Sequence, residues 1–148
     1  MKIYLILFIF LAASLLSAEV TEDINGYWLS QSQEAVIEIY SREGLTFGRI
    51  AWLEEPLEED GEPKMDDKNP DPARRQDLIL GLEILKDFQA DGNKWKGGTI
   101  YDPETGKTYS SHMKLKDDNL HLRGYIGISL LGRTEVWTRL RELPGQKD

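Results

Sequence analysis

The residues best able to do chemistry are the two histidines, His112 and His121, and the serine that precedes the first of them. A Ser-His arrangement suggests nucleophilic catalysis, and two neighbouring histidines suggest a metal site. Ser111 and His112, however, are adjacent on a predicted strand, so they point to opposite faces, and no nucleophile-elbow motif surrounds the serine. Zinc needs three or four converging ligands, whereas Lys114 and Arg123 accompany the histidines and the chain has no cysteine. We expect neither a serine hydrolase nor a zinc site.

A second candidate site is the oxygen-rich sequence around Asn69. Asp67, Asn69 and Asp71 have the alternate spacing that opens a calcium-binding loop. Where such a loop requires glycine the chain has Pro72, and where it requires a closing glutamate the chain has Leu78. A solvated acidic loop is therefore the prediction, with weak calcium binding as the alternative.

Other reaction types have no clear signature. The 26 acidic residues offer no way to select a carboxylate pair for glycoside chemistry. The glycines do not have the spacing of a phosphate-binding loop. We expect a protein that is not an enzyme and has no cofactor and no bound metal.

The histidines lie in a region with the alternating pattern of antiparallel strands, and that pattern recurs upstream. Eight strands are predicted: Tyr27–Ser30, Glu34–Tyr40, Leu45–Leu53, Leu80–Leu85, Trp95–Tyr101, Thr108–Leu115, Leu120–Ile126 and Arg133–Leu140. An amphipathic helix over Asp77–Phe88 is the alternative for the fourth, because its leucines also have helical spacing.

The register of the sixth and seventh strands can be derived from the residues. If the loop after Leu115 pairs that residue with Leu120, Met113 meets Leu122 and both apolar faces lie on one side. The opposite side is polar, which indicates an antiparallel sheet with one buried and one solvated face.

One long segment, Glu54–Pro72, interrupts the strands with four prolines and nine acidic residues, and therefore predicts a surface loop. A short helical turn over Ala73–Leu78 is expected to follow, with Asp71 as its cap and Pro72 at its first position.

Short links between most strands predict an all-β fold, an eight-stranded antiparallel up-and-down β-barrel, because a Greek-key sandwich needs long crossing connections. Closure also removes the edges that invite aggregation.

Residues 1–18 have the pattern of a secretory signal peptide. Lys2 precedes the apolar run Ile3–Leu16, and small residues precede a predicted cleavage after Ala18. An uncleaved anchor is the alternative. Residues 19–148 are expected to form one domain in the periplasm or outside the cell, without a stable membrane anchor. The net charge of −8 argues against binding nucleic acid or anionic lipid.

Two short motifs near the ends of the barrel are similar to lipocalins. Gly26-Tyr27-Trp28 opens the first strand and Trp137-Thr138-Arg139 closes the last. The resemblance implies that Trp28 packs under Arg139 and closes one end of the barrel. An ordinary core tryptophan is the alternative interpretation.

Longer blocks resemble the bacterial domain-of-unknown-function family 2147. They are Gly48-Arg49-Ile50, Asn69-Pro70-Asp71-Pro72, Gly81-Leu82, Trp95 through Pro103, Gly106-Lys107-Thr108-Tyr109, Arg123 through Gly127, Gly132-Arg133-Thr134 and Trp137-Thr138-Arg139. The resemblance implies export and a lipocalin-like (calycin) barrel, and it supplies no reaction.

These observations support two functional hypotheses. The first is a cell-envelope protein that holds a small apolar or amphipathic ligand inside the barrel. Its wall would be Ile37, Ile39, Phe47, Leu82, Ile84, Tyr109, Ser111, Met113, Leu122 and Ile126.

The second hypothesis is a filled barrel that acts as a structural or protein-interaction module. It would use the loop Glu54–Pro72 and an outer patch, with an unknown protein partner. The patch would comprise His112, Arg123, Tyr125, Arg133, Glu135 and Trp137.

Overall fold

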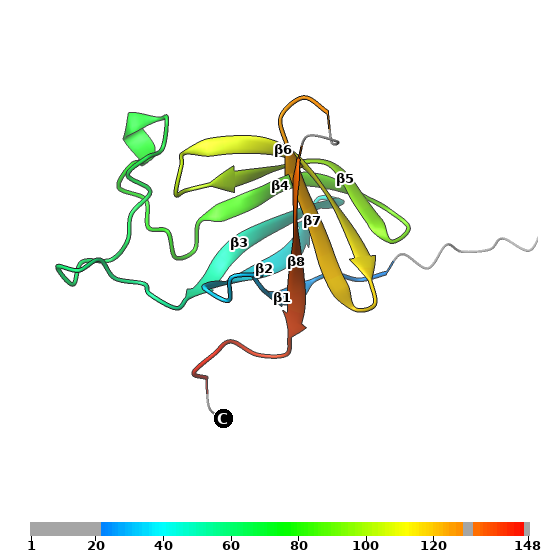
Figure 1. The fold of residues 1–148 in the computed structure, drawn as a ribbon, viewed down its shortest axis with the longest axis horizontal. Coiled ribbons are helices and arrows are strands. Elements are labelled where there is room, and N and C mark those ends of the chain that lie inside the picture. Colours follow the sequence, from blue (N-terminus) through cyan, green and yellow to red (C-terminus); the bar gives the residue numbers. More distant parts are fainter. Residues whose placement is uncertain (1–21, 129–131, 147–148) are drawn as a thin grey trace, which may run out of the picture.

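The computed structural model describes residues 22–128 and 132–146, which form a closed antiparallel barrel of eight strands (Figure 1). Each strand pairs with its neighbour in sequence, and β1 pairs with β8 to close the sheet. The strands are β1 (Gly26–Leu29), β2 (Ala35–Arg42), β3 (Leu45–Leu53), β4 (Glu83–Asp91), β5 (Lys94–Asp102), β6 (Lys107–Lys116), β7 (Asn119–Tyr125) and β8 (Arg133–Leu140). The predicted up-and-down barrel is confirmed.

The predicted signal peptide lies outside the described residues. Within the described ranges, no helix has the length and apolar character needed to cross a membrane.

The predicted register of β6 and β7 is confirmed. Leu115 pairs with Leu120 and Met113 with Leu122, and the ladder continues to Lys116. The hairpin turn is therefore only two residues, Asp117 and Asp118, which both have positive φ, as a tight turn between twisted strands requires.

Strand β4 differs most from its prediction. It begins at Glu83 and ends at Asp91, so the helical alternative is wrong. The register against β3 shifts twice, once at Ile84 and once around Asp87, which has a φ of 62°. These bulges break the two-residue period that the prediction used, and they return Phe88 to the buried face.

The segment between β3 and β4 is a long loop that extends beside the barrel in Figure 1. Its one helical element, η1 (Pro72–Arg74), is shorter than the predicted turn over Ala73–Leu78. The expected cap is present, because the Asp71 side chain accepts a hydrogen bond from the Ala73 amide and Pro72 opens the turn.

Side-chain hydrogen bonds hold the loop against the barrel. Asp66 exposes none of its surface. One of its carboxylate oxygens accepts a hydrogen bond from the Tyr101 hydroxyl of β5 at 2.6 Å, and the other accepts one from the Asn69 amide at 2.7 Å. Lys68 donates to the Glu104 carbonyl in the β5–β6 turn at 2.7 Å. These bonds hold the loop in one position although it has little regular structure.

Candidate functional site

The inner surface of the barrel contains most of the residues that the sequence assigns to a ligand-binding wall. Tyr109, half-buried, faces inward opposite Ile100. The buried members of the wall are Ile37, Ile39, Leu82, Ile84, Ser111, Met113 and Leu122.

Two assigned wall residues lie elsewhere. Phe47 pairs with Tyr40 across β3 and β2, on the outer face, while its neighbour Gly48 faces inward. Its ring is buried because the Arg42 guanidinium covers it at 3.9 Å and the Tyr40 ring stacks beside it. Ile126 follows the end of β7, where strand alternation no longer applies, and is 70% exposed. The assignment of both residues to the inner wall is therefore wrong.

The described interior is filled with side chains. Trp28, Leu85, Phe88 and Leu120 each have 0% exposed surface, so water has no access to their side chains. The packing extends onto the backbone of the opposing strands. A Cβ atom at Gly98 would lie 2.4 Å from the Phe88 ring, and one at Gly48 would lie 2.8 Å from the Leu85 side chain. The two large side chains thus occupy the space that side chains at these glycines would need.

Trp28 of β1 and Arg139 of β8 are cross-strand partners that pack against each other. The Arg139 guanidinium lies 4.3 Å from the centroid of the Trp28 ring. It also donates hydrogen bonds to the Asp118 carboxylate at 3.1 Å and to the Asp23 carbonyl at 3.2 Å. The Trp28 indole N–H donates to the Ile24 carbonyl at 2.8 Å, so the buried ring has its polar atom satisfied.

Comparison with known proteins assigns the family. A family model described as "Uncharacterized protein conserved in bacteria (DUF2147)" matches residues 26–139, which is most of the chain. The chain belongs to the DUF2147 family. None of the curated proteins compared with it matches.

Among solved structures, the DUF2147 chain is similar to protein HP1028 from Helicobacter pylori, which is described as belonging to the lipocalin family. The two share 24% sequence identity and a TM-score of 0.71, over 82% of this chain and 86% of the other. At this identity the likeness shows the fold alone, a lipocalin-like barrel.

Two of the three residues with calcium-loop spacing, Asn69 and Asp71, use side-chain oxygens to accept from backbone amides of the same loop. The Asn69 side-chain oxygen accepts from the Asp71 amide, and an Asp71 oxygen accepts from the Ala73 amide. In the part of the chain that the structure describes, no three histidine, cysteine or acidic side chains are grouped to hold a metal.

Two tyrosines of the outer face donate to carboxylates, Tyr40 to Glu83 and Tyr101 to Asp66. Burial, followed by these hydrogen bonds, raises the pKa of each tyrosine from 10 to about 12. Between those values the folded state keeps protons that the unfolded state loses, so stability is fully present below pH 10 and is lost as the pH rises towards 12.

We therefore expect the urea midpoint to fall between pH 10 and 12, and to fall less in Tyr40→Phe and in Tyr101→Phe. Tyrosinate absorbance, measured in the same samples, should show two late-titrating groups in the wild type and one in each variant. A pH-independent urea midpoint over this range would contradict the assignment.

The histidines lie where alternation places them. Ser111 faces inward and donates to the Arg123 carbonyl at 2.9 Å, whereas His112 faces outward beside the Tyr125 ring, with ring centroids 5.7 Å apart. His121 pairs with Lys114 on the same outer face.

The residues of the outer patch proposed from the sequence lie on both faces of the barrel wall. Trp137 pairs with Leu120 and is 2% exposed, so it belongs to the core. Glu135 pairs with Leu122 and accepts a hydrogen bond from the Trp137 indole at 3.1 Å, which places it on the inner face as well. The prediction that these two residues join His112 in an outer patch is wrong, because the sequence of the β7–β8 link left their register open.

The described surface includes two hollows of different size. The larger, about 430 Å³, lies over β5, β6 and β7. The smaller, about 270 Å³, lies between the segment before β1 and the residues Thr46, Ala90 and Trp95. Sequence reasoning missed the larger one, although three of its residues, His112, Lys114 and Tyr125, fall on the predicted solvated face.

Proposed function

We propose that this DUF2147 protein is an exported, non-enzymatic binding protein of the bacterial cell envelope that binds through the outside of a filled barrel. The observation that carries the proposal is the interior itself. Trp28, Phe88 and Met113 have no exposed surface, so an internal ligand would have to displace them. The export half of the proposal is supported by the signal-peptide pattern of residues 1–18.

A filled barrel suits binding from the outer face because it is rigid. Every strand is paired on both sides, and the long loop is fixed through Asp66 and Lys68. A surface held in one conformation loses little conformational entropy when a ligand binds.

The second candidate is the carrier of a small apolar ligand. Its support is the lipocalin-like fold shared with HP1028 and the half-buried residues Tyr109 and Ile100 on the inner face. Such a ligand would be confined to the barrel end near these residues, because the side chains around Phe88 leave no room.

Native mass spectrometry of the protein purified from its own envelope separates the two candidates. We expect the mass of residues 19–148 with nothing bound, or with a polar adduct that high salt removes. An apolar adduct that survives salt and leaves only in organic solvent would overturn the proposal in favour of the carrier. A mass that includes residues 1–18 would contradict the export half.

A titration with the neutral dye Nile red is the companion measurement. We expect no saturable fluorescence increase with the wild type. Saturable binding by the wild type, competed by fatty alcohols, would again favour the carrier.

A further inference from the structure

The larger hollow is a groove whose shape arises from a bulge in β5. Between the pairs Trp95–Met113 and Gly98–Ser111, two residues of β5, Lys96 and Gly97, face the single residue His112 of β6. Gly97 has a φ of 73°, and no atom lies within 4 Å of where its Cβ would be. The groove is lined by Lys94, Lys96, Gly97, His112, Met113, Lys114 and Tyr125.

The charged residues that line the groove are all lysines, and the nearest acid is Asp91 of β4, which lies opposite Lys94. Lys94 lies directly opposite Lys114, and His112 lies directly opposite Arg123. Like charges that face each other across a sheet are destabilising. Lys96 forms an ion pair with Asp91 at 2.9 Å, but over residues 22–128 and 132–146 neither Lys94 nor Lys114 takes part in one. This concentration of positive charge occurs in a chain of net charge −8.

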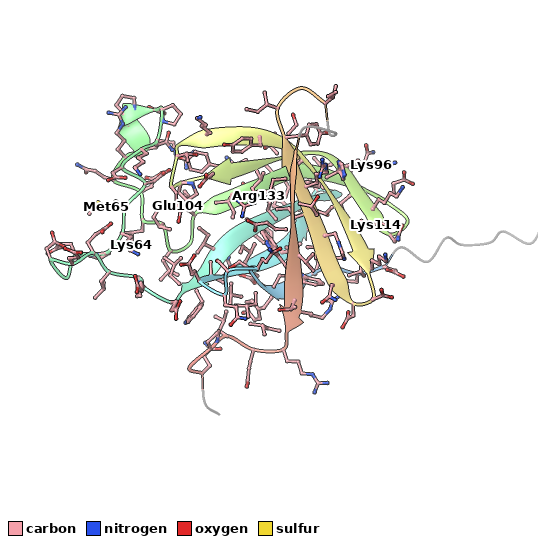
Figure 2. All side chains as sticks on the ribbon, in the orientation of Figure 1. Lys64, Met65, Lys96, Glu104, Lys114 and Arg133 are labelled. Atoms are coloured by element: carbon pink, nitrogen blue, oxygen red, sulfur yellow. The ribbon has the colours of Figure 1, made fainter. Side chains whose placement is uncertain are left out.

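The walls of the groove also provide apolar surface. The Tyr125 ring lies against the His112 ring, and the lysine side chains present their methylene stems. A volume of about 430 Å³ falls in the range of small-molecule sites. Figure 2 shows Lys96 and Lys114 on one side of the barrel, away from Lys64 on the long loop.

We propose that this groove binds a small organic anion, with its phosphate or carboxylate group between Lys94, Lys114 and His112 and its apolar body against Tyr125. The inference rests on the proposed function, since it names the ligand class taken by the outer face. The anion would relieve the repulsion between Lys94 and Lys114 and accept charge-assisted hydrogen bonds from their ammonium groups.

The charges that face His112 make binding depend on pH. Burial lowers the pKa of His112, and so do Arg123 of β7 and Lys94 and Lys96 of β5. Lys114 lies on the same strand. A bound anion favours the protonated ring, so binding takes up a proton and the affinity should rise as the pH falls.

The test is an NMR titration of the full mature protein with phenyl phosphate. We expect saturable shifts in the amides of β5, β6 and β7, and weaker binding of inorganic phosphate, which lacks the ring. Neutral benzyl alcohol should not bind. Equal affinity for inorganic and phenyl phosphate would overturn the apolar part of the site, and no saturable shift with either probe would overturn the whole site.

Substitutions test which residues bind the anion. Lys94→Gln and Lys114→Gln should each weaken phenyl phosphate binding about tenfold, and both should fold at least as well as the wild type because each removes a repulsion. Lys64→Gln, on the distant loop, is the matched control and should bind normally. Equal affinity in all three variants would place the anion elsewhere.

The pH dependence gives an independent readout. In a His121→Gln background, which leaves one histidine, saturating phenyl phosphate should raise the pKa of His112 by about one unit. An unchanged pKa would remove His112 from the site. If the groove fails these tests while Nile red is still excluded, only this inference falls, whereas uptake of Nile red would overturn the proposed function itself.

Discussion

Replacing Phe88 by alanine should lower the free energy of unfolding by about 3–5 kcal/mol and give the barrel an interior binding site. The Phe88 ring has no exposed surface and lies directly over the backbone of Gly98. Its removal leaves a hollow the size of a phenyl ring lined by apolar side chains, and such hollows stay dry and bind benzene or xenon. Urea unfolding measures the first effect, and a titration with benzene followed by NMR measures the second.

Two further variants serve as controls for the Phe88 result. Phe88→Leu should cost less than Phe88→Ala, because it removes fewer atoms. Gly98→Ala should destabilise the wild type by about 1–3 kcal/mol, because the new methyl group meets the ring, and should cost much less when Phe88 is already alanine. Additive costs for Gly98→Ala and Phe88→Ala would show that the ring does not fill this space.

Replacing Trp28 by alanine should be about as damaging, with a loss of about 3–5 kcal/mol. The ring is fully buried, its N–H donates to the Ile24 carbonyl, and the Arg139 guanidinium covers its outer side. Arg139→Ala should cost less, since the guanidinium is partly exposed. A double-mutant cycle between the two should give a coupling of about 0.5–2 kcal/mol.

Arg141→Ala is the matched control for Arg139, because Arg141 is an exposed arginine two residues further along the chain. It should leave the urea midpoint nearly unchanged. If Arg139→Ala and Arg141→Ala have the same effect, or if the coupling with Trp28 is zero, the contact between Arg139 and Trp28 does not stabilise the folded barrel.

The sequence predicts the fold where the side-chain period is unbroken. Strands β3 and β8 have their predicted bounds, and the β6–β7 register follows from two apolar faces that must coincide. Strand β4 was predicted too early and too short because its bulges at Ile84 and Asp87 interrupt the period. A bulge depends on the partner strand, so a single strand's pattern does not reveal it.

Hydrophobicity alone predicts the wrong environment for residues that are buried by side chains on the outer face of the barrel. Phe47 was assigned to the interior because it is apolar, but it is buried by Arg42 and Tyr40 on the outer face. The sequence predicts a solvated loop around Asp66, but the Asp66 carboxylate is buried and bonded to Tyr101, which is distant in sequence. Both cases require the tertiary structure, because the covering side chains lie on other elements.

Whether the barrel is hollow or filled could not be predicted either, because it depends on which large side chain faces which glycine. The pairing of Phe88 with Gly98 and of Leu85 with Gly48 is set by the same bulges. The basic groove was missed for a related reason. Lys94, Lys96 and Lys114 are visible in the sequence, but the shift of register at Gly97 that opens the groove is not.

Crystals of the wild type and of Phe88→Ala under xenon pressure test the central claim most directly, because xenon enters any apolar hollow large enough to hold it. The filled barrel predicts no xenon among Trp28, Phe88 and Met113 in the wild type, and a well-occupied xenon site in Phe88→Ala in place of the lost ring. Xenon bound inside the wild-type barrel would contradict the filled interior and favour the carrier of an internal apolar ligand.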